Sequence, residues 1–454
     1  TEAALGRWNT GVFDRLDRLV YSTFMSAMEA SGRAVFGSWI ASGAMALTLT
    51  TLACGPTNPP GTGGTGGAGG SSGSSGSNQC FGMELPPRAR AYSAPGPASL
   101  EPYAVSGGFR TAEPAAAGFD PAKLEAALSF TIPQATTKGI LVLRKGYIVA
   151  ERYMNGFTAT TRQESYSVAK GFTSALMGIA INQGLIPNPD HRACNAYPVE
   201  WPCANTSDPR SRITVRHLMN LQAGFQWKED WRSTANFLEN DTIRGGANLI
   251  DFALPRPSVA EPGTVQRYST ADPALLSGVL QGAAGRTALD YARQVLFGPL
   301  GITNVSWSSD PKGRTTTQAG LQLTMRDYAK FGYLYLRGGK WDNTQIVPQP
   351  WVDLTTKRVD VCQDRYRYLW HTNPPIRLGS YDPACSDFPN CVPRTLTDLP
   401  ADGFFAEGVF GQFIFIFPSA DLVVVRLAQD QMGSEFWDDY ARGFMTRVFD
   451  AITS

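Results

Sequence analysis

One tetrad in the sequence combines a hydroxyl group and an amine at helical spacing. In Ser167-Val168-Ala169-Lys170 the amine follows the hydroxyl by three residues, one turn later on the same helix face. A serine is a poor nucleophile until a base removes its proton, and a lysine serves as that base when burial or nearby positive charge lowers its pKa. The positive end of the helix dipole adds to this lowering. The tetrad therefore predicts Ser167 as a nucleophile activated by Lys170.

The sequence around the tetrad decides whether it can be catalytic, because the Ser-x-x-Lys spacing also occurs by chance. A second match, at residues 309–312, reads Ser-Asp-Pro-Lys, and its Asp-Pro step breaks the helix that the geometry needs. We expect a turn there. Ser167 instead opens a long apolar helix that has Gly184 as its C-terminal stop.

A tyrosine is the second candidate for proton transfer. Residues 262–270, Pro-Gly-Thr-Val-Gln-Arg-Tyr-Ser-Thr, are expected to form a short extended segment that leads into a helix beginning near Pro273. Tyr268 there can relay a proton between the nucleophile and the leaving group, or act as the base where cationic neighbours favour its phenolate. The alternative is an ordinary half-buried tyrosine of a strand.

The hydrophobic pattern predicts the elements that must position these residues. Runs at 139–144 and 147–153 are rich in β-branched and aromatic residues and predict a hairpin. Runs at 412–417 and 422–427 predict a second hairpin, joined by Pro-Ser-Ala-Asp. Strand pairs at both ends indicate an α/β fold with one mainly antiparallel sheet flanked by helices, and a helical subdomain in the middle. Besides the helix at Ser167, helices are predicted after the N-cap Asp120 and at residues 215–221, 273–282, 287–297, 324–336 and 435–452.

Five short motifs occur in an order that is more specific than any one of them. They lie at residues 164–171, 218–224, 268–270, 298–301 and 324–332. Together they resemble the β-lactamase-related serine hydrolases: ampC-type β-lactamases, certain penicillin-binding proteins, bacterial esterases and 6-aminohexanoate-dimer (nylon oligomer) hydrolases. The resemblance runs from about residue 117 to 452 and implies a β-lactamase/transpeptidase-like fold. It also implies that Ser167 forms an acyl-enzyme, with Lys170 and Tyr268 as general base and acid.

A further segment, residues 406–412, is similar to the nylon-oligomer hydrolase version of the family's third motif. In that version a backbone N–H of the strand and the N–H of the serine form the oxyanion hole, which implies Val409 and Ser167 here. The flanking Gly408 and Phe410 are then expected to contact substrate. The β-lactamases and peptidases of the family carry Lys-Thr-Gly or His-Thr-Gly on this strand, and neither is present.

Two more positions bear on the substrate. Thr270 replaces the asparagine that is usual in the family's Tyr-x motif, and Trp231 stands where the nylon-oligomer hydrolases carry a tyrosine that assists the amide leaving group. Both are expected to contact substrate. Because Trp231 offers only an indole N–H, small carboxylic esters are the leading substrates, since they need less help in leaving. Hydrolysis of 6-aminohexanoate oligomers is the first alternative, followed by β-lactamase or D-Ala peptidase activity.

Other classes of function find less support. A Ser-His-Asp hydrolase would need His191, His217 or His371, none of which accompanies a plausible nucleophile elbow. A non-catalytic surface scaffold would be expected to lose the serine, lysine or tyrosine. We expect no metal and no cofactor, because no metal-ligand spacing is present. The net charge of +1 shows no excess of basic residues of the kind that binds nucleic acid, so a small molecule is the expected partner. No feature specifies an oligomeric state.

The N-terminal part of the chain resembles an export segment followed by a spacer. Residues 1–54 contain a short apolar run that ends at Cys54, which suggests a lipoprotein signal, although Thr51 departs from its usual cleavage box. A plain signal peptide or a retained membrane anchor are the alternatives. We expect residues 55–103 to form a flexible linker rich in Gly and Ser, and residues 104–454 to form the hydrolase domain. We therefore expect an exported protein, periplasmic or at the cell surface, anchored through lipidated Cys54.

The cysteines agree with export. Seven are present, and lipidation of Cys54 leaves six to pair as disulfides. Cys194 and Cys203 are the expected first pair, because they bracket a short segment that contains two prolines. The other four allow three pairings, which the sequence does not rank: Cys80, Cys362, Cys385 and Cys391.

Overall fold

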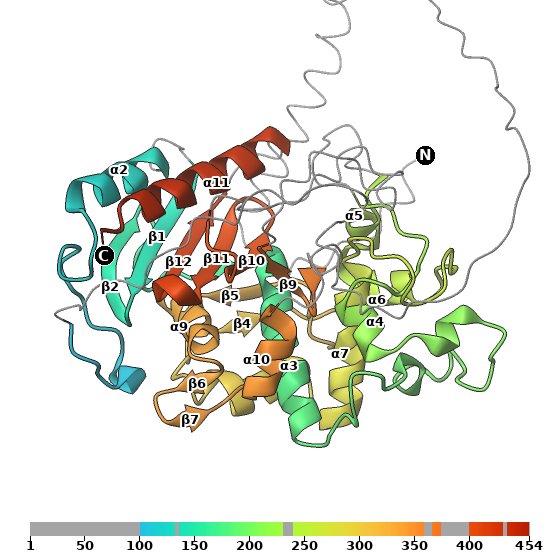
Figure 1. Cartoon of the computed structure of the whole chain (residues 1–454). Helices are drawn as coiled ribbons and strands as arrows, with labels where there is room; N and C mark the ends of the chain where they lie inside the picture. Colours follow the sequence, from blue (N-terminus) through green and yellow to red (C-terminus); the bar gives the residue numbers. More distant parts are fainter. Residues whose placement is uncertain are drawn as a thin grey trace, which may run out of the picture. The chain divides into compact units, whose positions relative to one another are not determined.

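A seven-stranded antiparallel sheet forms the centre of the computed structural model, which describes residues 100–131, 136–229, 239–357, 366–373, 399–429 and 434–453 (Figure 1). Its strands follow the order β2-β1-β12-β11-β10-β9-β8, so the first and last strands of the chain meet in its interior. The strands are β1 (Thr137–Arg144), β2 (Tyr147–Tyr153), β8 (Tyr366–Arg367), β9 (Trp370–Thr372), β10 (Phe404–Gly408), β11 (Gln412–Phe417) and β12 (Leu422–Ala428).

Tight turns produce both predicted hairpins. Lys145 and Gly146 both have positive φ, 53° and 83°, which suits the twist of a two-residue hairpin turn between β1 and β2. A 3₁₀ turn at Pro418–Ala420, followed by Asp421 at φ 48°, joins β11 to β12. The two hairpins then pair with each other, with Arg144 opposite Leu422.

Both faces of the sheet are covered, which explains why its strands are apolar along their whole length. Ile140 and Val142 of β1 face one core, together with α2 (Pro121–Thr131) and α11 (Ser434–Asp450), which lie side by side over the sheet (Figure 1). Leu141 and Leu143 face the other core, together with α3 (Ala169–Asn182) and α9 (Met325–Leu336). This alternation places α3, the helix that follows the nucleophile candidate, on the second face.

The middle of the chain forms the predicted helical subdomain beside the sheet (Figure 1). Two small sheets accompany it: β3 (Gln163–Glu164), β5 (Leu321–Leu323) and β4 (Ser306–Trp307) form one, and β6 (Lys340–Trp341) with β7 (Thr344–Gln345) the other. The further helices are α4 (Val215–Met219), α5 (Asp241–Gly245), α6 (Leu249–Ala253), α7 (Ala271–Ala284), α8 (Ala288–Ala292), a π-helical turn at Arg293–Phe297, and α10 (Gln349–Thr356).

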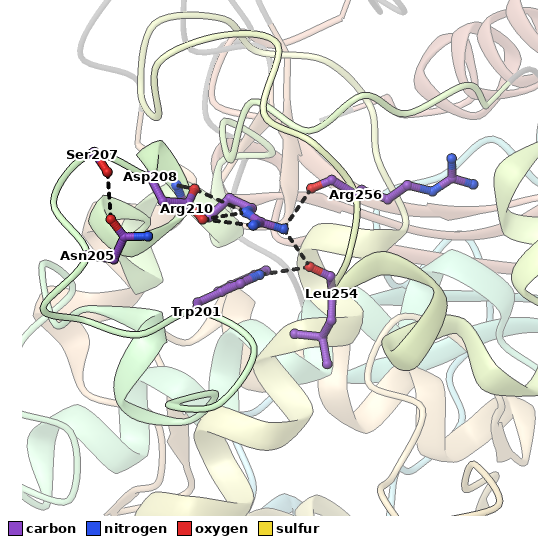
Figure 2. A network of polar contacts seen from close by, with 7 residues as sticks. All are labelled: Trp201, Asn205, Ser207, Asp208, Arg210, Leu254 and Arg256. Carbon is purple, nitrogen blue, oxygen red and sulfur yellow. Dashed lines mark hydrogen bonds and ion pairs between the residues drawn. The ribbon is translucent and has the colours of Figure 1, made fainter.

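An arginine fastens the loops of this subdomain to the end of α6 (Figure 2). Arg210 pairs with Asp208 and donates to the carbonyl oxygens of Leu254 and Arg256, at 3.2 and 3.4 Å. The indole N–H of Trp201 donates to the same Leu254 carbonyl at 2.8 Å. The carbonyl oxygens of Leu254, the C-cap of this short helix, and of Arg256 beyond it thereby obtain side-chain donors.

The predicted α/β architecture, a mainly antiparallel sheet with flanking helices and a helical subdomain, is confirmed. The second tetrad does not form a helix: a turn at residues 310–313 is closed by a hydrogen bond from Gly313 N to the Asp310 carbonyl at 2.9 Å, as expected. The structure joins Cys194 and Cys203 in a disulfide. Within the described part of the chain, no helix is both long and apolar enough to cross a membrane. Residues 1–54, most of the linker at 55–103, Trp231 and the other five cysteines lie outside the described residues.

Candidate active site

Ser167 lies in a 3₁₀ turn, Tyr166–Val168, that runs directly into α3. Tyr166 has φ 46°, an uncommon conformation for a bulky residue, and such conformations concentrate at functional sites. One oxygen of Glu164 fixes this turn, because it accepts from Tyr166 N at 3.1 Å and from Gly320 N at 2.7 Å. Ser167 is half-buried, two residues before the first residue of α3.

Lys170 is the buried partner of Ser167. Its side chain is 1% exposed, and its Nζ donates to Ser167 Oγ at 2.7 Å and to the Gln318 carbonyl oxygen at 3.2 Å. Burial lowers the pKa of Lys170 to about 8, although the negative charge of Glu229 opposes part of that effect. A lysine with such a pKa has a substantial neutral fraction near pH 8 and can take a proton from the hydroxyl beside it.

Tyr268 reaches the same oxygen from the segment that precedes α7. Its hydroxyl donates to Ser167 Oγ at 2.9 Å, and Lys170 Nζ lies 5.2 Å from the centroid of its ring. The ring of Tyr366 meets it edge to face, with centroids 6.0 Å apart. The structure therefore brings the three predicted catalytic residues together around one oxygen atom, while their catalytic roles stay a prediction.

The predicted oxyanion hole lies where β10 ends against the nucleophile turn. A Cβ atom on Gly408 would stand 3.2 Å from Ser167 N, so the strand end closely approaches the serine backbone. Val409 follows in a tight turn in which Phe410 and Gly411 have positive φ, 65° and 88°. The Gln412 side chain holds this turn, because its Nε2 donates to the carbonyl oxygens of Val409 and Phe410.

Two aromatic rings stand beside these backbone groups. Tyr166 precedes Ser167, Phe410 follows Val409, and their rings meet edge to face with centroids 5.0 Å apart. Both side chains are half-buried. The predicted contact of Phe410 with substrate stays a prediction, and Tyr166 is a neighbour that the sequence did not single out.

Thr270 takes part in a buried network that was not foreseen. Its backbone N–H donates to Glu229 Oε2 at 2.7 Å, and its hydroxyl donates to Glu229 Oε1 at 2.5 Å. The indole N–H of Trp227 donates to the same carboxylate at 2.8 Å. The Thr270 side chain, 4% exposed, is thus engaged with Glu229, and its predicted contact with substrate stays a prediction.

A second buried carboxyl group lies on the other side of this segment. Asp272 accepts from Ser269 Oγ at 2.7 Å and from Ala223 N at 3.0 Å. Burial raises the pKa of the Asp272 carboxyl to about 7, and the neighbouring charge of Glu229 adds to the rise. Acidic residues are usually exposed, so nothing in the sequence marked Asp272 or Glu229 as buried.

Two of the three histidines, His217 and His371, make contacts that support the fold. His217 Nδ1 accepts from Thr214 N at 3.2 Å and completes a capping box at the start of α4. His371 stacks on Phe405 with ring centroids 4.9 Å apart. Among the residues that the structure describes, no three His, Cys, Asp or Glu side chains are grouped so that they could hold a metal ion.

Comparison with known proteins shows the family to which the chain belongs. The sequence profile described as beta-lactamase matches residues 134–442, which is more than half of the chain. The chain belongs to the beta-lactamase family. A curated relative in this family, the 6-aminohexanoate-dimer hydrolase of Paenarthrobacter ureafaciens, is 23% identical over 345 residues that cover 71% of this chain and 81% of the relative.

Solved structures show the same beta-lactamase-family fold. A Bacillus anthracis protein assigned as a 6-aminohexanoate-dimer hydrolase superposes with a TM-score of 0.58 and 19% identity, over 71% of this chain and 81% of that one. EstCE1, described as a hydrolase with promiscuous acyltransferase activity, superposes with a TM-score of 0.54 and 16% identity, over 73% and 98%. The protein is thus a hydrolase of the beta-lactamase family, and small molecules are the substrates that this membership indicates.

Proposed function

We propose that this protein is a serine hydrolase that cleaves small carboxylic esters through an acyl-enzyme on Ser167. The observation that carries the proposal is the position of Ser167 Oγ, which lies within hydrogen-bond distance of both Lys170 Nζ and Tyr268 Oη. A nucleophile, a base of lowered pKa and a second proton carrier thus meet at one atom, as covalent catalysis requires.

The proposed reaction uses these groups in turn. Neutral Lys170 takes the hydroxyl proton as Ser167 Oγ attacks the ester carbonyl carbon. The negative charge that develops on the carbonyl oxygen is stabilised by the backbone N–H groups of Ser167 and Val409. When the ester C–O bond breaks, Tyr268 gives its proton to the departing alkoxide and regains one from Lys170. Water then attacks the acyl-enzyme, and the same groups return Ser167 to its starting state.

Amide hydrolysis is the second candidate, and the similarity to the Paenarthrobacter ureafaciens enzyme favours it. An amine leaves less readily than an alkoxide and needs a proton while the C–N bond breaks. We rank esters first, because Trp231 replaces the tyrosine that assists this step in the nylon-oligomer hydrolases.

A matched substrate panel tests the proposal. A p-nitrophenyl ester, the linear aminohexanoate dimer and a chromogenic cephalosporin are offered to the wild type and to Ser167→Ala. We expect turnover of the ester by the wild type only, and labelling of Ser167 by a fluorophosphonate. Lys170→Ala and Tyr268→Phe should each lower the rate by on the order of a hundredfold. Ester turnover that persists in Ser167→Ala would exclude this serine from the mechanism, and absence of labelling would favour a non-catalytic scaffold.

A further inference from the structure

Glu229 is 6% exposed and contacts the segment that carries the catalytic tyrosine candidate, and its charge acts on Lys170. Both of its oxygens accept hydrogen bonds, from Trp227 and from the backbone and hydroxyl of Thr270, as suits an ionised carboxylate. Resting on the function proposed above, we propose that Glu229 is a positioning residue that fixes the backbone next to Tyr268 and places a negative charge where it acts on Lys170.

The carboxylate is itself held rigidly. Its neighbour Lys228 exchanges two hydrogen bonds with Asp241, from Lys228 N to Asp241 Oδ2 at 2.8 Å and from Asp241 N to the Lys228 carbonyl at 2.7 Å. Arg256 pairs with the same aspartate at 3.0 Å. The stretch that ends in Glu229 is therefore anchored to α5, and a side chain on an anchored backbone can define the position of its partner.

The partner is the peptide that ends two residues after Tyr268. Thr270 is the residue before α7, and its N–H and hydroxyl both donate to Glu229. Asp272 holds the same segment from the other side through Ser269 Oγ. With its backbone fixed at these points, the segment has little freedom to move the Tyr268 hydroxyl away from Ser167, and a shift of about 1 Å in such a group can cost a hundredfold in rate.

The charge of Glu229 reaches the base as well. It raises the pKa of Lys170 against the lowering by burial, and it also raises the pKa of Asp272 and of Tyr366. Among the described titratable groups, Glu229 acts on Lys170 and the Tyr268 ring lies beside its Nζ, while Tyr366 responds to Tyr268, Glu229 and Asp272. Asp272 acts on Tyr366 but is not among the groups that shift the pKa of Lys170, so Glu229 is the charge to change.

Glu229→Gln removes this charge and can keep the hydrogen bonds. The amide oxygen can accept from Trp227 and Thr270 N, while the amide nitrogen donates to the Thr270 hydroxyl, which is able to accept. NMR titration of the protein with lysine labelled at ¹³Cε reports the protonation of Lys170 whether or not any substrate is turned over. We expect the Lys170 midpoint to move to lower pH in Glu229→Gln, by on the order of one pH unit. The resonance is assigned by its loss in Lys170→Met.

Thr270→Val is the matched variant, because it removes one hydrogen bond and keeps the charge. We expect the Lys170 midpoint to stay in place, while kcat for the ester falls several-fold with little change in KM. An unchanged midpoint in folded Glu229→Gln would overturn the electrostatic part of the inference, and an unchanged kcat in Thr270→Val would overturn the positioning part. Fluorophosphonate labelling of wild-type Ser167 tests the proposed serine hydrolase function independently of the role of Glu229.

Discussion

Gly408 approaches Ser165 so closely that a Cβ atom on the glycine would stand 2.4 Å from the serine carbonyl oxygen. The added Cβ atom would meet a backbone oxygen, so no flexible side chain can move aside to relieve the contact. The end of β10 and the turn that carries the nucleophile are therefore held at a separation that only glycine permits. The two N–H groups of the proposed oxyanion hole sit one residue beyond Gly408 and two residues beyond Ser165.

Gly408→Ala should therefore damage catalysis more than stability. The methyl group has to separate β10 from the nucleophile turn, and loss of one oxyanion donor costs on the order of a hundredfold in kcat. Gly282→Ala in α7 is the control, because nothing lies within 4 Å of its added Cβ. We expect the control to keep its ester turnover and its melting temperature. Wild-type kcat in folded Gly408→Ala would show that Val409 N–H is not an oxyanion donor.

The buried amine of Lys170 should make stability depend on pH. Its folded pKa of about 8 lies below the ordinary value of 10.5, so the unfolded chain binds more protons between these two values. The free energy of unfolding is therefore highest above pH 10.5, where Lys170 is neutral in both states. It falls as pH is lowered through 8, because the buried amine must then be charged. Lys170→Met removes the cost of charging, on the order of 3 kcal/mol below pH 8. Thermal melts should show a larger gain for this variant at pH 6 than at pH 10, and equal gains would contradict the lowered pKa.

Asp272 should give the opposite dependence. Its folded pKa of about 7 lies above the ordinary 3.8, so its contribution to stability is full below pH 3.8 and is lost as pH rises through 7. Asp272→Asn keeps donors and acceptors for Ser269 and Ala223 but does not ionise. Denaturant unfolding measures the free energy of unfolding of both proteins at pH 5 and pH 8. The difference between variant and wild type should favour the variant more at pH 8 than at pH 5. The reverse order would mean that Asp272 is ionised throughout this range.

The disulfide between Cys194 and Cys203 offers a test of the predicted export. It closes a loop with a sequence separation of 9, and such crosslinks contribute on the order of 2–3 kcal/mol by restricting the unfolded chain. We expect peptide mapping of the unreduced native protein to recover the two cysteines linked, and reductant to lower the melting temperature. The double variant Cys194→Ala/Cys203→Ala keeps the other five cysteines and should lack this part of the response. Recovery of both as free thiols would argue for a reducing compartment.

The parts that the sequence predicted well are those specified by local chemistry. Ser167 and Lys170 are related by helical spacing, and Lys145-Gly146 provides a turn, so both arrangements could be predicted from neighbouring residues. Tyr268 lies far from Ser167 along the chain, and only the resemblance to a family brought them together. Glu229 could not be predicted, because its burial depends on Trp227 and Thr270, which reach it only in the folded state.

Short elements also escaped prediction. Helices α5 and α6 have five residues each, too few for a hydrophobic period to emerge, and β8 and β9 are shorter still. The helix expected at residues 287–297 is present, but its second half, Arg293–Phe297, is a π-helical turn, in which Gly298 N bonds to the Arg293 carbonyl at 3.0 Å. Backbone pairing of this kind leaves no signature in residue types.

The pairing of β1 with β12 has a consequence for folding during synthesis. A ribosome releases the β1–β2 hairpin long before it makes β12, the strand that must lie against β1. Until then β1 carries an unsatisfied edge and two apolar faces, the combination that invites aggregation. The strand that completes the nucleophile's surroundings, β10, is likewise made long after Ser167 and Lys170, so a nascent chain that already holds these two residues still lacks its proposed oxyanion donor. Activity of this protein should therefore arise only after β10 has been made.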